Sequence, residues 1–188
     1  MAKKKQILFP VVFMVALTAI YTFALAFINE TSLPLIEAQE TQRTENSVRY
    51  VLGAGKDEAI DYVDEYYYVY EKASEVEGYA FPFTGKGLWG SISGYVAFTP
   101  DFETLLGIDF TAHSETPGLG GRIDEAWFKE QFRGIALTGD APVVFRPSEG
   151  GNVDSVTGAT LTSKAVSDIV NAFVVEVRAF AKEANLYE

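Results

Sequence analysis

The chain has 188 residues and a formal net charge of −11, with 26 acidic residues against 15 basic ones. An acidic surface of this kind repels nucleic acid, so no nucleic-acid partner is expected. The sequence contains no cysteine and a single histidine, His113. This excludes disulfides, thiolate-ligated zinc or iron–sulfur centres and a haem held by two histidines, so no metal site is expected. A redox role would therefore need an organic cofactor.

An apolar run covers residues 7–28 and contains no charged residue. At about 1.5 Å per residue it is long enough to cross the hydrocarbon core, which predicts one transmembrane helix within residues 1–28. A cleaved signal peptide is the alternative, because three basic residues precede the run and Ala24–Ala26 resembles a cleavage site. Lys3, Lys4 and Lys5 place the N-terminus in the cytoplasm by the positive-inside rule. We therefore expect a single-pass protein of the inner (cytoplasmic) membrane whose remaining residues are extracytoplasmic.

The next segments read as a stalk followed by strands. Leu35–Leu52 has helical spacing and ends before a glycine, which predicts a helical stalk over residues 29–56. Aromatic and β-branched residues between Tyr62 and Phe83 predict two strands, with a break at Ser74–Gly78. A second hairpin is expected to join Ile92–Phe98 to Leu105–Phe110.

The C-terminal half reads mainly as helix. We expect a short helix over Asp124–Phe132, a short strand over Val143–Phe145 and an amphipathic helix from Thr162 to about Asn185. Strands grouped between helices favour the α+β class. The expected architecture is a transmembrane helix followed by one domain, residues 57–188, with a mainly antiparallel sheet packed by helices.

The segment Gly85–Gly90 satisfies the G-x-G-x-x-G pattern of a dinucleotide-binding turn. That motif requires a helix to open at its last glycine, whereas the residues that follow Gly90 read as a strand. The sequence therefore favours a turn between two strands.

The segment His113–Gly121 combines one proline with three glycines at the end of a predicted strand. Such a loop brings backbone close to something flat or bulky, or else it is only a tight connection with His113 hydrogen-bonded at the strand end. Glu115 is a possible partner of His113. A hydrolytic triad is unsupported, because Ser114 is adjacent to the single histidine and has no nucleophile-elbow context.

The segment Asp154–Ser163 stands immediately before the terminal helix. In one interpretation it is a glycine turn with a helix cap supplied by Thr160, Thr162 or Ser163. In the other it is an anion site, where free N–H groups and the helix dipole stabilise a phosphate and a hydroxyl becomes esterified.

These residues resemble a known family, the FMN-binding subunits of two membrane complexes: the C subunit of the sodium-translocating NADH:quinone oxidoreductase (Nqr) and the G subunit of the Rnf complex. An Asp-x-x-Ser/Thr-Gly-Ala-Thr sequence marks the family and is matched over Asp154–Thr160, with Thr157 where serine is common. The Gly87–Trp89 stretch, the Glu115–Gly120 loop and the aromatic helix after it occur in the same order. These features do not distinguish the Nqr type from the Rnf type.

The resemblance implies that FMN is joined to Thr160 through a phosphoester bond, formed by a flavin transferase that uses FAD and Mg²⁺. It implies that the loop after His113 borders the isoalloxazine, with Leu119 against the ring, and that the turn before Thr160 surrounds the phosphate. The implied cofactor-binding residues are Thr160 itself, His113, Glu115, Thr116, Pro117, Gly118, Leu119 and Gly120 in the loop, and Asp154, Thr157, Gly158, Ala159 and Ser163 near the attachment point.

The resemblance further implies an electron relay within a sodium-translocating oxidoreductase complex. The partners would be the other subunits, which carry the substrate sites, so the chain would not be catalytic alone. Two alternatives stay open: a membrane-anchored extracytoplasmic assembly or binding module without covalent flavin, and a flavin domain that serves a different membrane reductase.

Overall fold

The computed structural model describes residues 2–63, 66–139, 141–146 and 148–186. Backbone contacts divide the chain into two compact units, Met1–Arg43 and Thr44–Glu188. Helix α1, Ala2–Leu52, contributes residues to both units. The limits of the expected stalk, residues 29 and 56, remain a prediction, and the structure assigns the last turns of α1 to the second unit.

The first unit contains α1 up to Arg43, including its apolar part. The most apolar window of this helix has a mean hydropathy of 2.4, and none of it is buried, so α1 is long and apolar enough to cross a membrane. The helix expected from Leu35 onward is not a separate element, because α1 is continuous and has both Pro10 and Pro34 inside it. Each proline removes one backbone N–H donor, and the helix nevertheless continues on both sides of it.

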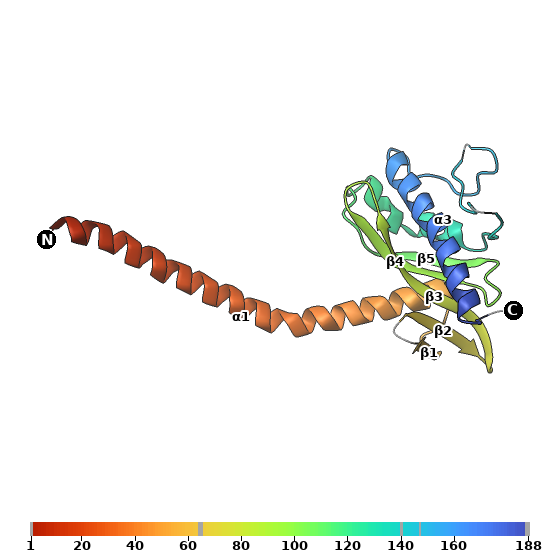
Figure 1. The fold of residues 1–188 in the computed structure, drawn as a ribbon, viewed down its shortest axis with the longest axis horizontal. Coiled ribbons are helices and arrows are strands. Elements are labelled where there is room, and N and C mark those ends of the chain that lie inside the picture. Colours follow the sequence, from red (N-terminus) through yellow and green to blue (C-terminus); the bar gives the residue numbers. More distant parts are fainter. Residues whose placement is uncertain (1, 64–65, 140, 147, 187–188) are drawn as a thin grey trace. The chain divides into compact units, whose positions relative to one another are not determined.

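The second unit is built on a five-stranded antiparallel sheet in the order β1-β2-β3-β4-β5 (Figure 1). The strands are β1, Ile60–Val63; β2, Tyr67–Lys72; β3, Glu75–Lys86; β4, Ser91–Phe98; and β5, Leu105–Ala112. This confirms the expected α+β class with an antiparallel sheet. The β2–β3 turn lies at Ala73 and Ser74, which both have positive φ. Strand β3 therefore begins at Glu75, inside the break that was expected at Ser74–Gly78.

One face of the sheet carries the main core. Alternate residues of β3 and β4, such as Phe81, Phe83 and Val96, point to this face and are buried there. The amphipathic helix α3, Thr160–Glu183, covers it with Val166, Val170 and other residues at helical spacing, and Figure 1 shows α3 crossing the strands. The terminal helix expected from the sequence is therefore present, and it begins two residues earlier than expected.

The opposite face of the sheet receives the last turns of α1. Val48, Val51 and Leu52 are buried there against small residues of the strands. A Cβ added at Gly107 would lie 2.9 Å from the Val51 carbonyl oxygen, and one added at Gly78 would lie 3.2 Å from Leu52 Cδ2. Small side chains on this face therefore let the helix approach the sheet closely.

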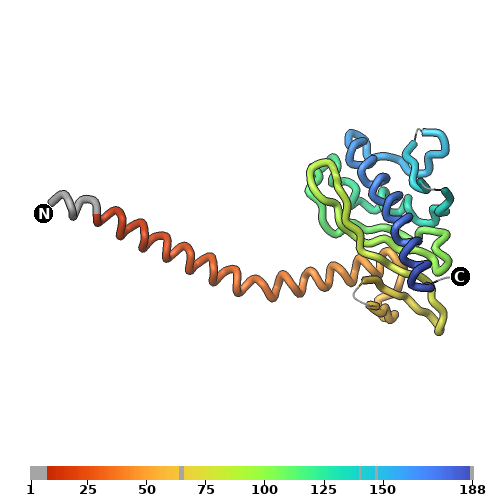
Figure 2. The backbone as a smooth tube through the Cα atoms, in the orientation of Figure 1, coloured from red at the N-terminus to blue at the C-terminus, as the bar shows by residue number. Residues whose placement is uncertain are grey.

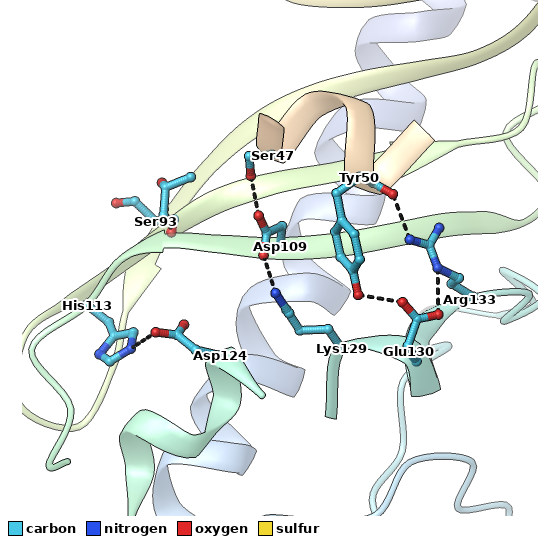
Figure 3. Close-up of polar contacts among 10 residues, drawn as sticks. Ser47, Tyr50, Ser93, Asp109, His113, Asp124, Lys129, Glu130 and Arg133 are labelled. Carbon is cyan, nitrogen blue, oxygen red and sulfur yellow. Dashed lines mark hydrogen bonds and ion pairs between the residues drawn. The ribbon is translucent and has the colours of Figure 1, made fainter. Parts of the chain in front are cut away.

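A polar cluster fixes the end of α1 to this unit (Figure 3). We call it the α1-end cluster; it comprises Ser47, Tyr50, Asp109, Lys129, Glu130 and Arg133. Asp109 accepts a hydrogen bond of 2.6 Å from Ser47 and pairs with Lys129 at 2.7 Å. Burial, reinforced by the hydrogen bond to Glu130, raises the pKa of Tyr50 to about 12. Tyr50 therefore stays protonated as a donor at physiological pH.

Arg133 satisfies backbone carbonyls that α1 leaves open at its C-terminus. Its guanidinium donates to the carbonyl oxygens of Tyr50 at 2.6 Å, Val51 at 3.3 Å and Leu106 at 2.6 Å, and it pairs with Glu130. The last carbonyls of a helix have no partner inside the helix. Arg133 therefore closes the end of α1 and ties it to β5.

Replacing Arg133 with alanine is expected to lower the free energy of unfolding by about 2–4 kcal/mol, because the carbonyls lose a charged donor and the ring of Tyr50 loses one of the two cations that lie over it. Chemical denaturation of the full chain in detergent measures this. Arg122→Ala is the control, since Arg122 makes an exposed ion pair with Glu125 and lies over the exposed ring of Trp127, so that its loss should cost at most about 1 kcal/mol. Equal losses in both variants would contradict the assignment.

The connection between β5 and α3, coloured green to light blue in Figure 2, differs from expectation at two places. The helix expected over Asp124–Phe132 is divided into η1, Gly120–Asp124; α2, Ala126–Lys129; and η2, Glu130–Phe132. The strand expected over Val143–Phe145 was wrong: Phe145 forms one isolated bridge to Val153, and no sheet strand lies beside it among the described residues. Side-chain amides hold this segment instead, since Val143 N–H donates to Asn171 and Val144 N–H donates to Asn152.

Candidate functional site

The start of α3 is shaped by a tight turn. Ala159 N–H donates to the Val156 carbonyl at 2.9 Å, and Gly158 has a φ of +79°, a conformation that favours glycine. The buried Ser163 hydroxyl accepts from Val156 N–H at 2.9 Å and so fixes the turn to the helix. Thr160 is left as the first residue of α3 and is exposed.

The expected hydroxyl cap was wrong. The N-cap residue is Ala159, and no side chain of the turn accepts a bond from the first amides of α3. The hydroxyls of Thr162 and Ser163 are buried and point to other partners. The first backbone N–H groups of a helix have no acceptor within the helix. At the start of α3 these N–H groups are therefore available to a ligand beside the exposed Thr160 hydroxyl.

The loop expected at Glu115–Gly120 lies against this helix start. Its turn is closed by bonds from Leu119 N–H and Gly121 N–H to the Thr116 carbonyl. A Cβ added at Gly158 would lie 3.3 Å from Leu119 Cδ2, so the loop and the turn before Thr160 are in contact. Thr116, Pro117, Gly118 and Leu119 are exposed, as are Thr157 and Gly158 of the turn. The structure therefore brings together the two segments that the sequence singled out.

Glu115 joins three segments of the site. Its side chain is buried, with 4% exposed. One carboxylate oxygen accepts from Leu88 N–H at 2.8 Å and Trp89 N–H at 3.1 Å, and the other accepts from the Thr162 hydroxyl at 2.5 Å. The β3–β4 turn, the loop and the start of α3 are thus held by one carboxylate.

The position of the Glu115 carboxylate explains why Gly87 and Gly120 carry no side chain. A Cβ added at Gly87 would lie 2.6 Å from Glu115 Oε1, and one added at Gly120 would lie 2.6 Å from the Thr162 hydroxyl and 2.9 Å from Glu115 Oε2. Neither position has room for a side chain. The G-x-G-x-x-G segment is accordingly a turn between β3 and β4, as the sequence favoured, and it serves Glu115.

The carboxylate of Glu115, named above as a possible partner of His113, does not contact its ring. His113 Nε2 lies 3.0 Å from Asp124 Oδ2, and its Nδ1 accepts from the backbone N–H of Glu115 at 3.2 Å (Figure 3 shows the Asp124 contact). With Nδ1 accepting, the ring proton is on Nε2 and is donated to Asp124. His113 therefore fixes the loop to η1.

Asp154 forms an ion pair beside a pocket that contains Thr160. Both oxygens of Asp154 accept from Arg146 Nη1, at 3.0 and 3.1 Å. The pocket has a volume of about 330 Å³ and lies between residues 143–146 and the start of α3. Arg146, Thr160, Lys164 and Asp168 are among its lining residues. The pocket thus holds two cations beside Thr160, and each is paired with a carboxylate, Arg146 with Asp154 and Lys164 with Asp168.

Sequence reasoning missed part of the site. Leu88, Trp89 and Leu161 are exposed apolar side chains on the segments that Glu115 joins, and Trp89 is 70% exposed. The Gly-Leu-Trp stretch was the signal that could have identified Trp89, whereas Arg146 lies outside every motif. In the described ranges, no three acidic or histidine side chains gather as metal ligands would.

Comparison with known proteins identifies the domain. Residues 87–175 match the family described as the FMN-binding domain. The chain is similar to the C subunit of the Na⁺-translocating NADH-quinone reductase of Pasteurella multocida, with 37% identity over 55% of this chain and 43% of that protein. It is also similar to the G subunit of the ion-translocating oxidoreductase complex of Methanosarcina acetivorans, with 29% identity over 95% of this chain and 98% of that protein.

The crystal structure of Shewanella oneidensis NqrC has the same fold in the region that aligns. It matches with a TM-score of 0.51 and 32% identity, over 57% of this chain and 54% of that chain. The chain thus spans about half the length of the NqrC relatives it matches. The matched region contains the β3–β4 turn, the loop and the start of α3 described above. Residues 87–175 therefore match the FMN-binding domain, and the chain is similar both to the C subunit of the Na⁺-translocating NADH-quinone reductase and to the G subunit of the ion-translocating oxidoreductase complex.

Proposed function

We propose that the chain carries FMN on Thr160 through a phosphoester bond and relays electrons within a membrane ion-translocating oxidoreductase complex. The observation that carries the proposal is the position of Thr160 in the FMN-binding domain. Its hydroxyl is exposed at the first residue of α3, next to open helix amides, and it ends the Asp-x-x-Thr-Gly-Ala-Thr sequence.

The residues around Thr160 fit FMN chemically. The start of α3 and the pocket cations Arg146 and Lys164 suit the phosphate, because both favour negative charge. The exposed apolar side chains of Trp89 and Leu119 suit an aromatic ring system, which would remove them from water. The two environments meet at the start of α3, which lines the pocket and is joined by Glu115 to the β3–β4 turn and the loop.

Attachment needs a flavin transferase as a partner, with FAD as donor. The Thr160 oxygen would form the new phosphoester bond as the phosphoanhydride bond of FAD breaks, so that AMP leaves and the hydroxyl proton is released. Thr160 is well placed for this reaction, because its exposed position needs no unfolding to reach an enzyme. Thr162 and Ser163 are buried and committed to Glu115 and Val156, which leaves them unsuitable as acceptors.

A cofactor held by a covalent bond suits a carrier that never releases it. Bound FMN supplies the capacity to take up and give back electrons. We infer that other subunits of an Nqr-type or Rnf-type complex provide the donor and acceptor sites, with sodium as the coupled ion. The apolar part of α1 would anchor the chain in the cytoplasmic membrane with Lys3–Lys5 inside and the FMN domain outside.

Intact mass of the purified chain tests the proposal. Chain produced in a host with the flavin transferase should show the mass gain of FMN less water and a fluorescent band on a denaturing gel, and chain from a host without it should show neither. The flavin in native membranes should then bleach on addition of NADH or of reduced ferredoxin. A chain without flavin from the competent host would leave the anchored assembly module as the function.

A further inference from the structure

Lys164 lies one helical turn after Thr160, and both residues line the 330 Å³ pocket. The Lys164 ammonium is 2.7 Å from each carboxylate oxygen of Asp168. Both side chains are mostly exposed, at 67% and 62%. An exposed pair of this kind contributes little to stability, so Lys164 can change partner at small cost.

The placement of Lys164 gains little from α3 itself. Lys164 is in the second turn of the helix, far from the C-terminal end where the helix dipole stabilises a cation. The pair with Asp168 is also in the weaker order, with the basic residue N-terminal to the acidic one. A lysine at this position can therefore serve an anion next to Thr160 at little cost to the helix.

Arg146, the other cation of the pocket, is less free to move. Its Nη1 donates to both oxygens of Asp154, its Nε donates to the Gly151 carbonyl at 3.3 Å, and its Nη2 donates to the Asn152 carbonyl at 3.4 Å. These bonds hold the guanidinium within its own loop. Lys164 is thus the pocket cation that can turn toward Thr160.

We propose that Lys164 is the counter-charge of the phosphoester on Thr160 and that it leaves Asp168 when FMN is attached. This rests on the proposed function. A phosphate esterified on both sides carries one negative charge, and residues four apart on a helix have Cβ atoms about 5–6 Å apart, within reach of a lysine. Asp168 lines the same pocket as Thr160 and also a neighbouring groove that Lys86 lines, so Lys86 is a second cation on the side of Asp168 away from the pocket.

The difference in Tm between the FMN-carrying and FMN-free forms of the full chain in detergent tests the exchange. The two forms come from hosts with and without the flavin transferase, and mass confirms each. In Lys164→Gln the rise in Tm on FMN attachment should be smaller than in the wild type by roughly 2–4 °C. Lys164→Arg should restore it.

Lys182→Gln is the matched control, because it removes the same charge from the last turn of α3, roughly 30 Å away. Asp168→Asn should act in the opposite sense and enlarge the rise, since Lys164 then has no carboxylate to leave. Equal rises in Lys164→Gln, Lys182→Gln and the wild type would overturn the role of Lys164 while FMN attachment stands. A wild-type chain that acquires no FMN would overturn both.

Discussion

Thr160→Ala is expected to abolish covalent flavin completely while leaving the fold unchanged. The side chain is exposed and no described residue depends on its hydroxyl, so the free energy of unfolding should change by less than about 0.5 kcal/mol. Intact mass and in-gel fluorescence measure the flavin, and chemical denaturation measures the stability. The two readouts together separate the loss of an acceptor from a loss of structure.

Two controls sharpen this result. Thr160→Ser keeps a hydroxyl at the start of α3 and should retain flavin, whereas Thr41→Ala removes a hydroxyl that bonds only within α1 and should have no effect. Flavin that persisted in Thr160→Ala would contradict the assignment. Peptide mapping would then point to Thr157, the other exposed threonine of the turn, because Thr162 is buried.

Glu115→Ala should produce the second large effect, a loss of about 2–4 kcal/mol in the free energy of unfolding together with a lower yield of attached FMN. The substitution removes the charged acceptor of two backbone N–H groups and of the buried Thr162 hydroxyl. Without it the β3–β4 turn is no longer tied to the start of α3. Denaturation and the flavin-to-protein ratio measure the two losses.

Glu115→Gln provides the conservative comparison. Its amide oxygen can accept from Leu88 and Trp89 while its amide nitrogen donates to Thr162, so most of the stability and flavin should return. Glu103→Ala, at an exposed position, is the matched control and should be nearly neutral. If Glu115→Ala were as stable as Glu103→Ala, the carboxylate would not hold the site together.

Local patterns were sufficient to predict most of the fold. The apolar spacing from Val166 to Val177 predicted α3, and the β-branched and aromatic runs predicted β2 to β5, because these signals depend on one face meeting a core. Patterns failed where partners are distant in the sequence. Val143–Phe145 reads as a strand, yet its backbone bonds to side chains of Asn152 and Asn171.

In the candidate site, too, local motifs could be predicted from the sequence and contacts between distant residues could not. The Asp154–Thr160 sequence predicted the position of Thr160, because the motif is contiguous. The partner of His113 is Asp124, eleven residues further on, and the partners of Glu115 are in two other segments. Spacing along one chain does not reveal which carboxylate a fold will bury. The assignment of Glu115 as a cofactor-binding residue stays a prediction, and the structure shows its carboxylate accepting from two backbone N–H groups and the Thr162 hydroxyl.

The order of these segments along the chain has a consequence for biogenesis. The segment Gly87–Gly90, the loop after His113 and the turn before Thr160 are far apart in sequence, and α3 follows all three in chain order. Glu115 cannot receive the Thr162 hydroxyl until that helix has emerged and docked on the sheet. The acceptor hydroxyl therefore reaches its final setting only after all of these segments have been synthesised and packed together. Flavin attachment would then report that the whole domain has folded.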